Sequence, residues 1–250
     1  MSFYINDVAL KTLFFNGSEV NSLYFNGTQV WEKSDWPGWA NATWEDVYNL
    51  CKHKQSGKVA EWPEDVVLGV TKTTTLSTAV LGTTTFTMTL IGMDIDGAGV
   101  LTFAGSKATN SFKASSVTWS SNNVYSYCQN VYDYCDVKPY IKVLDKATYN
   151  QTTTNGGSAY ITSSGVWALS CNEVGLSSPT GIGEEYTSGV TTAYPYFASN
   201  TERKNLLAES YLRTRASDNT IIYYVYSNGA SISANRNYTN VYLAPCFAIG

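Results

Sequence analysis

The stretch Thr83-Thr84-Thr85-Phe86-Thr87-Met88-Thr89-Leu90-Ile91-Gly92-Met93-Asp94 alternates polar and apolar residues along most of its length. Phe86, Met88 and Leu90 recur at every second position, the period at which side chains of a β-strand reach the same face. Threonine fills much of the other face, and its branched side chain suits a pleated strand. We therefore expect a long strand here, with Phe86, Met88, Leu90 and Gly92 on one face.

Outward from this strand the pattern mixes helices and strands. Residues 44–54 form a predicted helix, with Thr43 as its N-cap and acidic residues in its first turn. Helical spacing of apolar residues also predicts helices over 120–135 and 137–147. Short strands are expected at 166–170, 221–226 and 242–249, with a turn at Asn228-Gly229, and residues 175–200 are expected to be rich in loops. This mixture predicts an α+β fold.

The first thirty residues carry a short repeat. Asn recurs at positions 6, 16 and 26, and the second and third copies read Asn16-Gly17 and Asn26-Gly27 between aromatic residues and Val. Asn-Gly favours the positive backbone angles of a two-residue hairpin turn. We expect a small N-terminal β-meander over 1–33, which serves attachment or oligomerisation, followed by a larger domain over 34–250 after the break at Pro37-Gly38.

Composition excludes several classes of protein. The charged fraction is 14% and the net charge is −4, so the chain lacks the basic surface of a nucleic-acid-binding protein. The opening residues lack the apolar core of a secretory signal, and no apolar run is long enough to span a membrane. Five widely spaced cysteines without a Cys-x-x-Cys pair are expected to be reduced and mostly buried.

Few residues are candidates for chemistry, and none forms a convincing catalytic set. The one histidine, His53, lies at the end of the first helix, where a cation complements exposed carbonyls. Glu184 and Glu185 are adjacent carboxylates in a polar loop, and Asp94-Ile95-Asp96-Gly97 lacks the further ligands of a calcium loop and fits a turn. We expect no catalytic residue, no metal and no cofactor.

The segment from Ser217 to Tyr242 consists almost entirely of Asn, Tyr, Ser, Thr, Ile, Ala and Val. Tyr supplies rigid amphipathic contact area and Ser and Asn supply adaptable hydrogen bonds, which is the composition of antibody binding loops. A plain Thr/Tyr-rich hairpin around an Asn-Gly turn has a similar composition. The candidate ligand-binding residues are Ser217, Asp218, Asn219, Ile221, Tyr223, Tyr224, Tyr226, Ser231, Ser233, Asn235, Arg236, Asn237, Tyr238, Asn240 and Tyr242.

Several short motifs carry a resemblance over residues 44–250: Thr43-Trp44-Glu45-Asp46-Val47, Leu90-Ile91-Gly92-Met93-Asp94, Trp167-Ala168-Leu169-Ser170-Cys171-Asn172-Glu173-Val174, Tyr211-Leu212-Arg213-Thr214 and Leu243-Ala244-Pro245-Cys246-Phe247. The sequence resembles a domain family of unknown function from gut bacteria and their phages. That family is similar to the C-type-lectin-like fold of the formylglycine-generating-enzyme branch and to the variable proteins of diversity-generating retroelements. The resemblance implies a C-type-lectin-like domain with a variable region over 211–243. Within this region Leu212 and Arg213 are expected to be fixed, and the residues from Pro245 to Ile249 after it are expected to be fixed as well.

The N-terminal repeats are similar to short modules at the ends of phage tail and virion proteins. Together these resemblances imply a tail-tip adhesin of a phage virion, not an enzyme, that binds a host cell-surface protein or glycan. Other virion proteins and further copies of the chain, with a trimer favoured, are the remaining expected partners. The calcium motifs of true lectins, Glu-Pro-Asn and Trp-Asn-Asp, are absent from the sequence. Alternatives are a glycan depolymerase that uses Glu184, Glu185 or Asp218, and a structural virion protein that binds no ligand.

Overall fold

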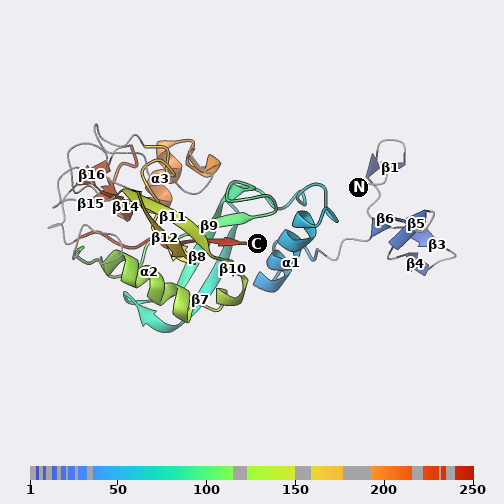
Figure 1. The fold of residues 1–250 in the computed structure, drawn as a ribbon, viewed down its shortest axis with the longest axis horizontal. Helices are drawn as coiled ribbons and strands as arrows, with labels where there is room; N and C mark the ends of the chain where they lie inside the picture. The colour runs from blue at the N-terminus through green and yellow to red at the C-terminus, as the bar shows by residue number, and fades with distance from the viewer. Residues whose placement is uncertain are drawn as a thin grey trace. The chain divides into compact units, whose positions relative to one another are not determined.

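A computed structural model gives the arrangement of the chain (Figure 1). It describes residues 4–5, 8–9, 13–15, 18–20, 22–25, 28–32, 36–114, 123–149, 159–176, 193–215, 222–230, 232–234 and 240–250. The chain divides into two compact units, Met1–Val66 and Val67–Gly250. The division expected at residue 33 therefore falls inside the first unit, which also contains the first helix.

The N-terminal repeats form three hairpins. Strands β1 (Tyr4–Ile5) and β2 (Val8–Ala9), β3 (Leu13–Phe15) and β4 (Ser18–Val20), and β5 (Ser22–Phe25) and β6 (Thr28–Glu32) pair as three two-stranded antiparallel sheets. Phe15 pairs with Ser18 and Phe25 pairs with Thr28. The two residues that connect each of these pairs along the chain are Asn and Gly. The prediction of short strands is confirmed, but they pair as three separate two-stranded sheets and not as the expected meander.

Helix α1 (Trp44–Gln55) follows in the first unit. Its N-cap is Thr43, whose hydroxyl accepts a hydrogen bond from the backbone of Asp46 at 3.1 Å, while the Asp46 carboxylate accepts one from the backbone of Thr43 at 2.7 Å. This reciprocal pair is a capping box, which satisfies two amides that the helix itself leaves without partners. Lys52, His53 and Lys54 occupy the last turn, as the sequence predicts.

A curled antiparallel sheet forms the core of the second unit. Its strands are β7 (Thr71–Val80), β8 (Thr83–Met93), β9 (Leu101–Gly105), β17 (Cys246–Ile249), β10 (Ile141–Lys142) and β13 (Val166–Trp167). The C-terminal strand β17 pairs with β9 on one edge, and β10 and β13 share its other edge. Phe86, Met88 and Leu90 are fully buried on β8, which confirms their predicted common face.

Helix α2 (Asn123–Tyr134) contacts β7 and β13, close to the predicted helix over 120–135. The second predicted helix, over 137–147, is wrong. A short 3₁₀ turn η2 (Lys138–Tyr140) leads into β10, and then β11 (Leu144–Tyr149) pairs along its whole length with β12 (Ala159–Ser164). The spacing of Ile141 and Leu144 resembles a helical face, but pairing with distant strands decides the conformation.

The rest of the second unit carries the candidate binding segment. A 3₁₀ turn η3 (Pro195–Phe197) precedes α3 (Asn200–Leu207), a helix within the stretch expected to form strands and loops. Strands β14 (Tyr211–Arg215), β15 (Ile222–Val225) and β16 (Ile232–Ala234) then form a three-stranded sheet. Figure 1 shows α2 and α3 on opposite sides of this unit. The fold is α+β.

Among the helices of the described residues, none has the length and apolarity to cross a bilayer.

Candidate binding surface and buried charge cluster

The candidate segment is built around β15, the central strand of its sheet. Tyr224 of β15 pairs with Tyr211 of β14 on one side and with Ser233 of β16 on the other. Tyr223 pairs with Ala234, and helix α3 contacts the same strand. Because β15 has a strand on each side and contacts α3, little of its surface is exposed to solvent.

Two of the predicted binding tyrosines are therefore core residues. The exposed fractions of Tyr223 and Tyr224 are 7% and 3%. Burial raises the pKa of the Tyr223 phenol, because a desolvated phenolate is disfavoured. The expectation that these two rings face solvent is wrong. Both faces of β15 are covered. Although Tyr223 and Tyr224 point to opposite faces of the strand, both rings are therefore buried.

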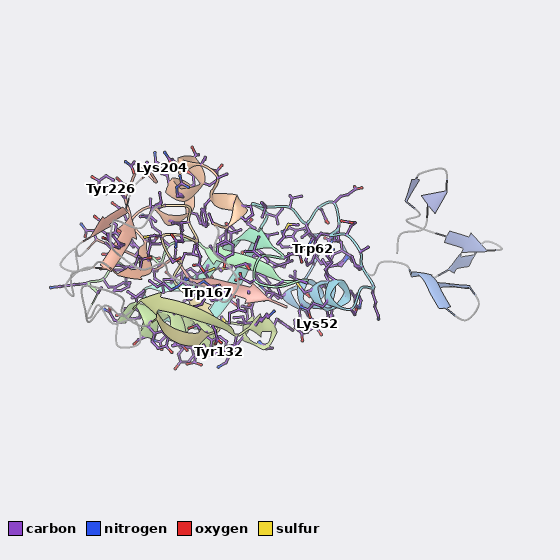
Figure 2. All side chains as sticks on the ribbon, turned by 45° about the horizontal axis from the view of Figure 1, so that its top comes forward. Lys52, Trp62, Tyr132, Trp167, Lys204 and Tyr226 are labelled. Atoms are coloured by element: carbon purple, nitrogen blue, oxygen red, sulfur yellow. The ribbon has the colours of Figure 1, made fainter. Side chains whose placement is uncertain are left out.

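Other members of the segment are accessible. Tyr226, directly after β15, is 45% exposed, Asn240 is exposed and Tyr242 is half-buried. Figure 2 shows Tyr226 at the periphery of the second unit, with Trp167 in its interior. Ser233 lies in β16. The remaining predicted site residues lie outside the described residues: Ser217, Asp218, Asn219, Ile221, Ser231, Asn235, Arg236, Asn237 and Tyr238.

Two charged residues that sequence reasoning missed, Lys107 and Glu209, lie close to Tyr242. The Lys107 Nζ atom lies 4.5 Å from the ring centroid of Tyr242 and 3.8 Å from Oε2 of Glu209. The backbone of Glu209 donates to the Val225 carbonyl at 2.7 Å, and its own carbonyl accepts from the Tyr242 backbone at 2.8 Å. We call Lys107, Glu209, Tyr226, Asn240 and Tyr242 the tyrosine patch. Nothing in their spacing along the chain points to this cluster.

The turn that follows Tyr226 is fixed to helix α3. Gly229 has φ +71, and a Cβ there would lie 2.3 Å from the Asn200 carbonyl oxygen and 2.6 Å from the Lys204 nitrogen. The buried Arg203 side chain donates through Nε to the Gly229 carbonyl at 2.8 Å. The predicted Asn228-Gly229 turn is confirmed, and only glycine allows this close approach. Tyr226 therefore projects from a turn that is held in place by the helix.

A second cluster, missed by sequence reasoning, lies inside the second unit. The Lys146 Nζ atom on β11 lies 3.1 Å from Oδ1 of Asp96 and 3.3 Å from Oε1 of Glu173. The Arg213 Nη1 atom on β14 lies 2.5 Å from Oε2 of Glu173. Tyr194 donates through its hydroxyl to Oδ2 of Asp96 at 2.7 Å. We call these five residues the charge cluster.

The charge cluster is neutral and closed to water. Exposed fractions of the four charged side chains are 0% for Lys146 and Arg213, 1% for Asp96 and 2% for Glu173. Two cations thus face two carboxylates, which is how proteins tolerate buried charge. Burial, with Glu173 and Asp96 adding repulsion, raises the pKa of Tyr194 well above its usual range, so its hydroxyl stays a donor. A substrate from solution does not reach this cluster.

The expected turn at Asp94 to Gly97 is present. Asp94 has φ 59, and its Oδ1 atom accepts from the Gly99 backbone at 2.6 Å. Asp96 lies in the same turn, and its side chain belongs to the charge cluster. Within the described part of the chain, no group of three or more His, Cys, Asp and Glu side chains is arranged to hold a metal ion. Glu184 and Glu185 lie outside the described residues.

All five cysteines are buried, as the sequence predicts. Burial raises the pKa of the Cys135 thiol to about 11, and it raises the pKa values of Cys128 and Cys246 further. A thiol that stays protonated is a poor nucleophile, so these three cysteines are inert core residues.

A family model described as a domain of unknown function (DUF6273) matches residues 93–250. No curated protein and no solved structure matches the chain. The matched residues contain all of the charge cluster and all of the tyrosine patch. Because the match covers well over half of the sequence, the chain belongs to the DUF6273 family.

Proposed function

We propose that this protein is a receptor-binding adhesin of a phage virion, located at the tail tip, that recognises a host cell-surface protein or glycan. The tyrosine patch is the described part of its binding surface. The observation that carries the proposal is that Tyr226 is 45% exposed although the turn after it is fixed to α3 through Gly229. A ligand that binds a preorganised aromatic side chain loses little conformational entropy.

The chemistry of the tyrosine patch suits recognition. Tyr226 and Tyr242 offer rings with a polar tip, and Asn240 offers both a donor and an acceptor. Lys107 and Glu209 add one charge of each sign at the surface, so the patch favours no ligand of strong net charge. A small patch of this kind gives modest affinity, and several copies in one virion raise it through avidity. A trimer is the assembly that we favour.

The finer fold assignment is part of the same proposal. We infer that residues 34–250 form a C-type-lectin-like domain in which 211–243 is the variable region. Strand β17 lies between β9 on one side and β10 and β13 on the other, and the candidate segment leaves the scaffold at β14 and returns before β17. Within this region the accessible positions, such as Tyr226 and Asn240, are the ones that can change without disturbing the core, because Tyr223 and Tyr224 are buried.

The expectation that the protein is not an enzyme also remains a proposal. Its support is that the one dense group of ionisable side chains, among the described residues, is paired internally and buried. A glycan depolymerase that uses Glu184, Glu185 or Asp218 is the alternative. Incubation with purified host polysaccharide separates the two, because a depolymerase produces new reducing ends and an adhesin does not.

Labelled protein applied to a panel of fixed gut bacterial strains tests the proposal. We expect saturable binding to at least one strain, with a Tyr226→Ala, Tyr242→Ala double variant at least tenfold weaker. A structural virion protein that binds no ligand would give no saturable binding to any strain.

A further inference from the structure

An amine and a carboxyl group face each other inside the charge cluster without intervening solvent. Lys146 Nζ lies 3.1 Å from Asp96 Oδ1, and both side chains are inaccessible. We propose that these two side chains condense into an intramolecular isopeptide bond. The bond would join the turn after β8 to strand β11, and the inference is independent of the adhesin proposal.

The second oxygen of Asp96 is set up to carry negative charge. Oδ2 accepts from the hydroxyl of Tyr194 at 2.7 Å and from the hydroxyl of Thr102 at 2.6 Å. Both donors stay protonated and fixed, and Thr102 is fully buried. Two fixed donors on one oxygen stabilise the tetrahedral intermediate that forms when an amine adds to a carboxyl carbon.

Glu173 is placed to move the protons. Its Oε1 atom lies 3.3 Å from Lys146 Nζ, within reach of a proton transfer after small adjustment, while Arg213 holds the other oxygen at 2.5 Å. The Trp167 ring lies 4.0 Å from the same Nζ atom and covers it. The nucleophile, the electrophile and the proton carrier thus lie within a single site from which water is excluded.

The reaction balances without a co-reactant. The Lys146 ammonium gives one proton to Oδ1 of Asp96, which leaves a neutral amine beside a neutral carboxyl group. The nitrogen lone pair forms a bond to the Asp96 Cγ atom, and Oδ2 carries the negative charge. Glu173 takes a second proton from the nitrogen and passes it to the Oδ1 hydroxyl. The bond from Cγ to Oδ1 then breaks, and one water molecule leaves as the amide forms.

Burial favours the product over the separate ions. Isolated ions in a protein interior carry a desolvation cost that their attraction repays only in part. The condensation removes one cation and one anion together, and it leaves Glu173 paired with Arg213. The net charge of the cluster stays at zero. Proximity replaces the encounter of two separate molecules, which lowers the barrier to amide formation between the amine and the carboxyl group.

Mass spectrometry of the full chain tests the proposal. Under denaturing conditions we expect a mass lower by one water molecule than the sequence requires. After trypsin, residues 73–107 should remain joined to residues 143–203, because a modified Lys146 is not cleaved. Three unlinked peptides at full mass, residues 73–107, 143–146 and 147–203, would overturn the proposal. A linear 73–107 peptide that has lost water would also overturn it, because Asp96-Gly97 would then have closed to a succinimide.

Three variants assign the roles. Lys146→Arg should restore the full mass, and Glu173→Gln should abolish or greatly slow the link. Lys138→Arg is the matched control: Lys138 makes an exposed ion pair with Asp133 at 2.8 Å, and this variant should keep the link. A link that survives Glu173→Gln would contradict the proton-carrying role. The wild-type mass decides the proposal even where a variant fails to fold.

Discussion

Arg213 donates through Nη1 to Oε2 of Glu173 across 2.5 Å, and solvent reaches 0% and 2% of the two side chains. The same Nη1 atom donates to the Ala168 carbonyl at 2.9 Å. The Glu173 carboxylate also accepts from the Ser170 backbone at 2.9 Å. One ion pair therefore fixes β14, the segment after β13 and the turn that holds Glu173.

Removing the cation of this pair should destabilise the protein strongly. Arg213→Met leaves Glu173 buried with its charge incompletely compensated, which costs about 3–5 kcal/mol of unfolding free energy. Urea unfolding at pH 7 measures it. Lys204→Met on the exposed face of α3 is the control, and it should stay within about 0.5 kcal/mol of wild type. Equal stability of both variants would mean that the buried pair contributes nothing.

The turn after β15 should tolerate only glycine at position 229. In Gly229→Ala the alanine would have to adopt a positive φ, and its Cβ atom would lie 2.3 Å from the backbone of α3. Gly69 in the same unit has φ +91, but a Cβ atom there would make only an ordinary contact of 3.5 Å with Tyr196. Gly69→Ala therefore measures only the cost of placing alanine at a positive φ. We expect about 1–2 kcal/mol for Gly69→Ala. Gly229→Ala should cost at least about 1 kcal/mol more, and similar losses in urea unfolding would contradict the close approach.

The tyrosines of the candidate segment should separate into two classes. Tyr224→Ala removes a ring that is 3% exposed and should cost about 3–5 kcal/mol of stability. Tyr226→Ala removes a ring that is 45% exposed and should cost no more than about 0.5 kcal/mol. Thermal unfolding of the two variants under the same conditions checks the difference. A large loss in Tyr226→Ala would place that ring in the core.

Stability should fall as the solution becomes alkaline. Cysteine thiols ionise near pH 9 in the unfolded chain, whereas burial holds the pKa of Cys135 at about 11 and those of Cys128 and Cys246 higher. Between these values the folded state binds more protons than the unfolded state, so the free energy of unfolding decreases with rising pH. Urea unfolding from pH 8 to 11 measures the slope. A Cys135→Ala variant should show a shallower decrease than wild type.

Local signals predicted the local elements. The Thr43 N-cap, the short strands on either side of the Asn-Gly pairs and the Asn228-Gly229 turn each depend on residues a few positions apart, and each is present. Helix α3 was missed because it has no apolar stripe: the stretch Asn200-Thr201-Glu202-Arg203-Lys204-Asn205 is wholly polar, and Arg203 is buried through hydrogen bonds to three carbonyl groups. No periodicity marks such a helix.

Elements set by distant pairing were not predictable. Strand β11 depends on β12, and β10 depends on the last residues of the chain, so the predicted helix over 137–147 failed. The charge cluster draws Asp96, Lys146, Glu173, Tyr194 and Arg213 from five separate elements or turns. No spacing in the sequence connects them, although Arg213 was expected to belong to the fixed scaffold.

The binding role of the tyrosine patch is tested most directly by the affinity of labelled protein for whole cells. Wild-type protein and the Tyr226→Ala, Tyr242→Ala double variant, matched for thermal stability, are titrated onto a panel of fixed gut bacterial strains. We predict saturable binding of wild type to at least one strain and at least tenfold weaker binding of the variant. Equal binding of the two proteins to a strain that the wild type recognises would contradict the assignment of the patch as the receptor site.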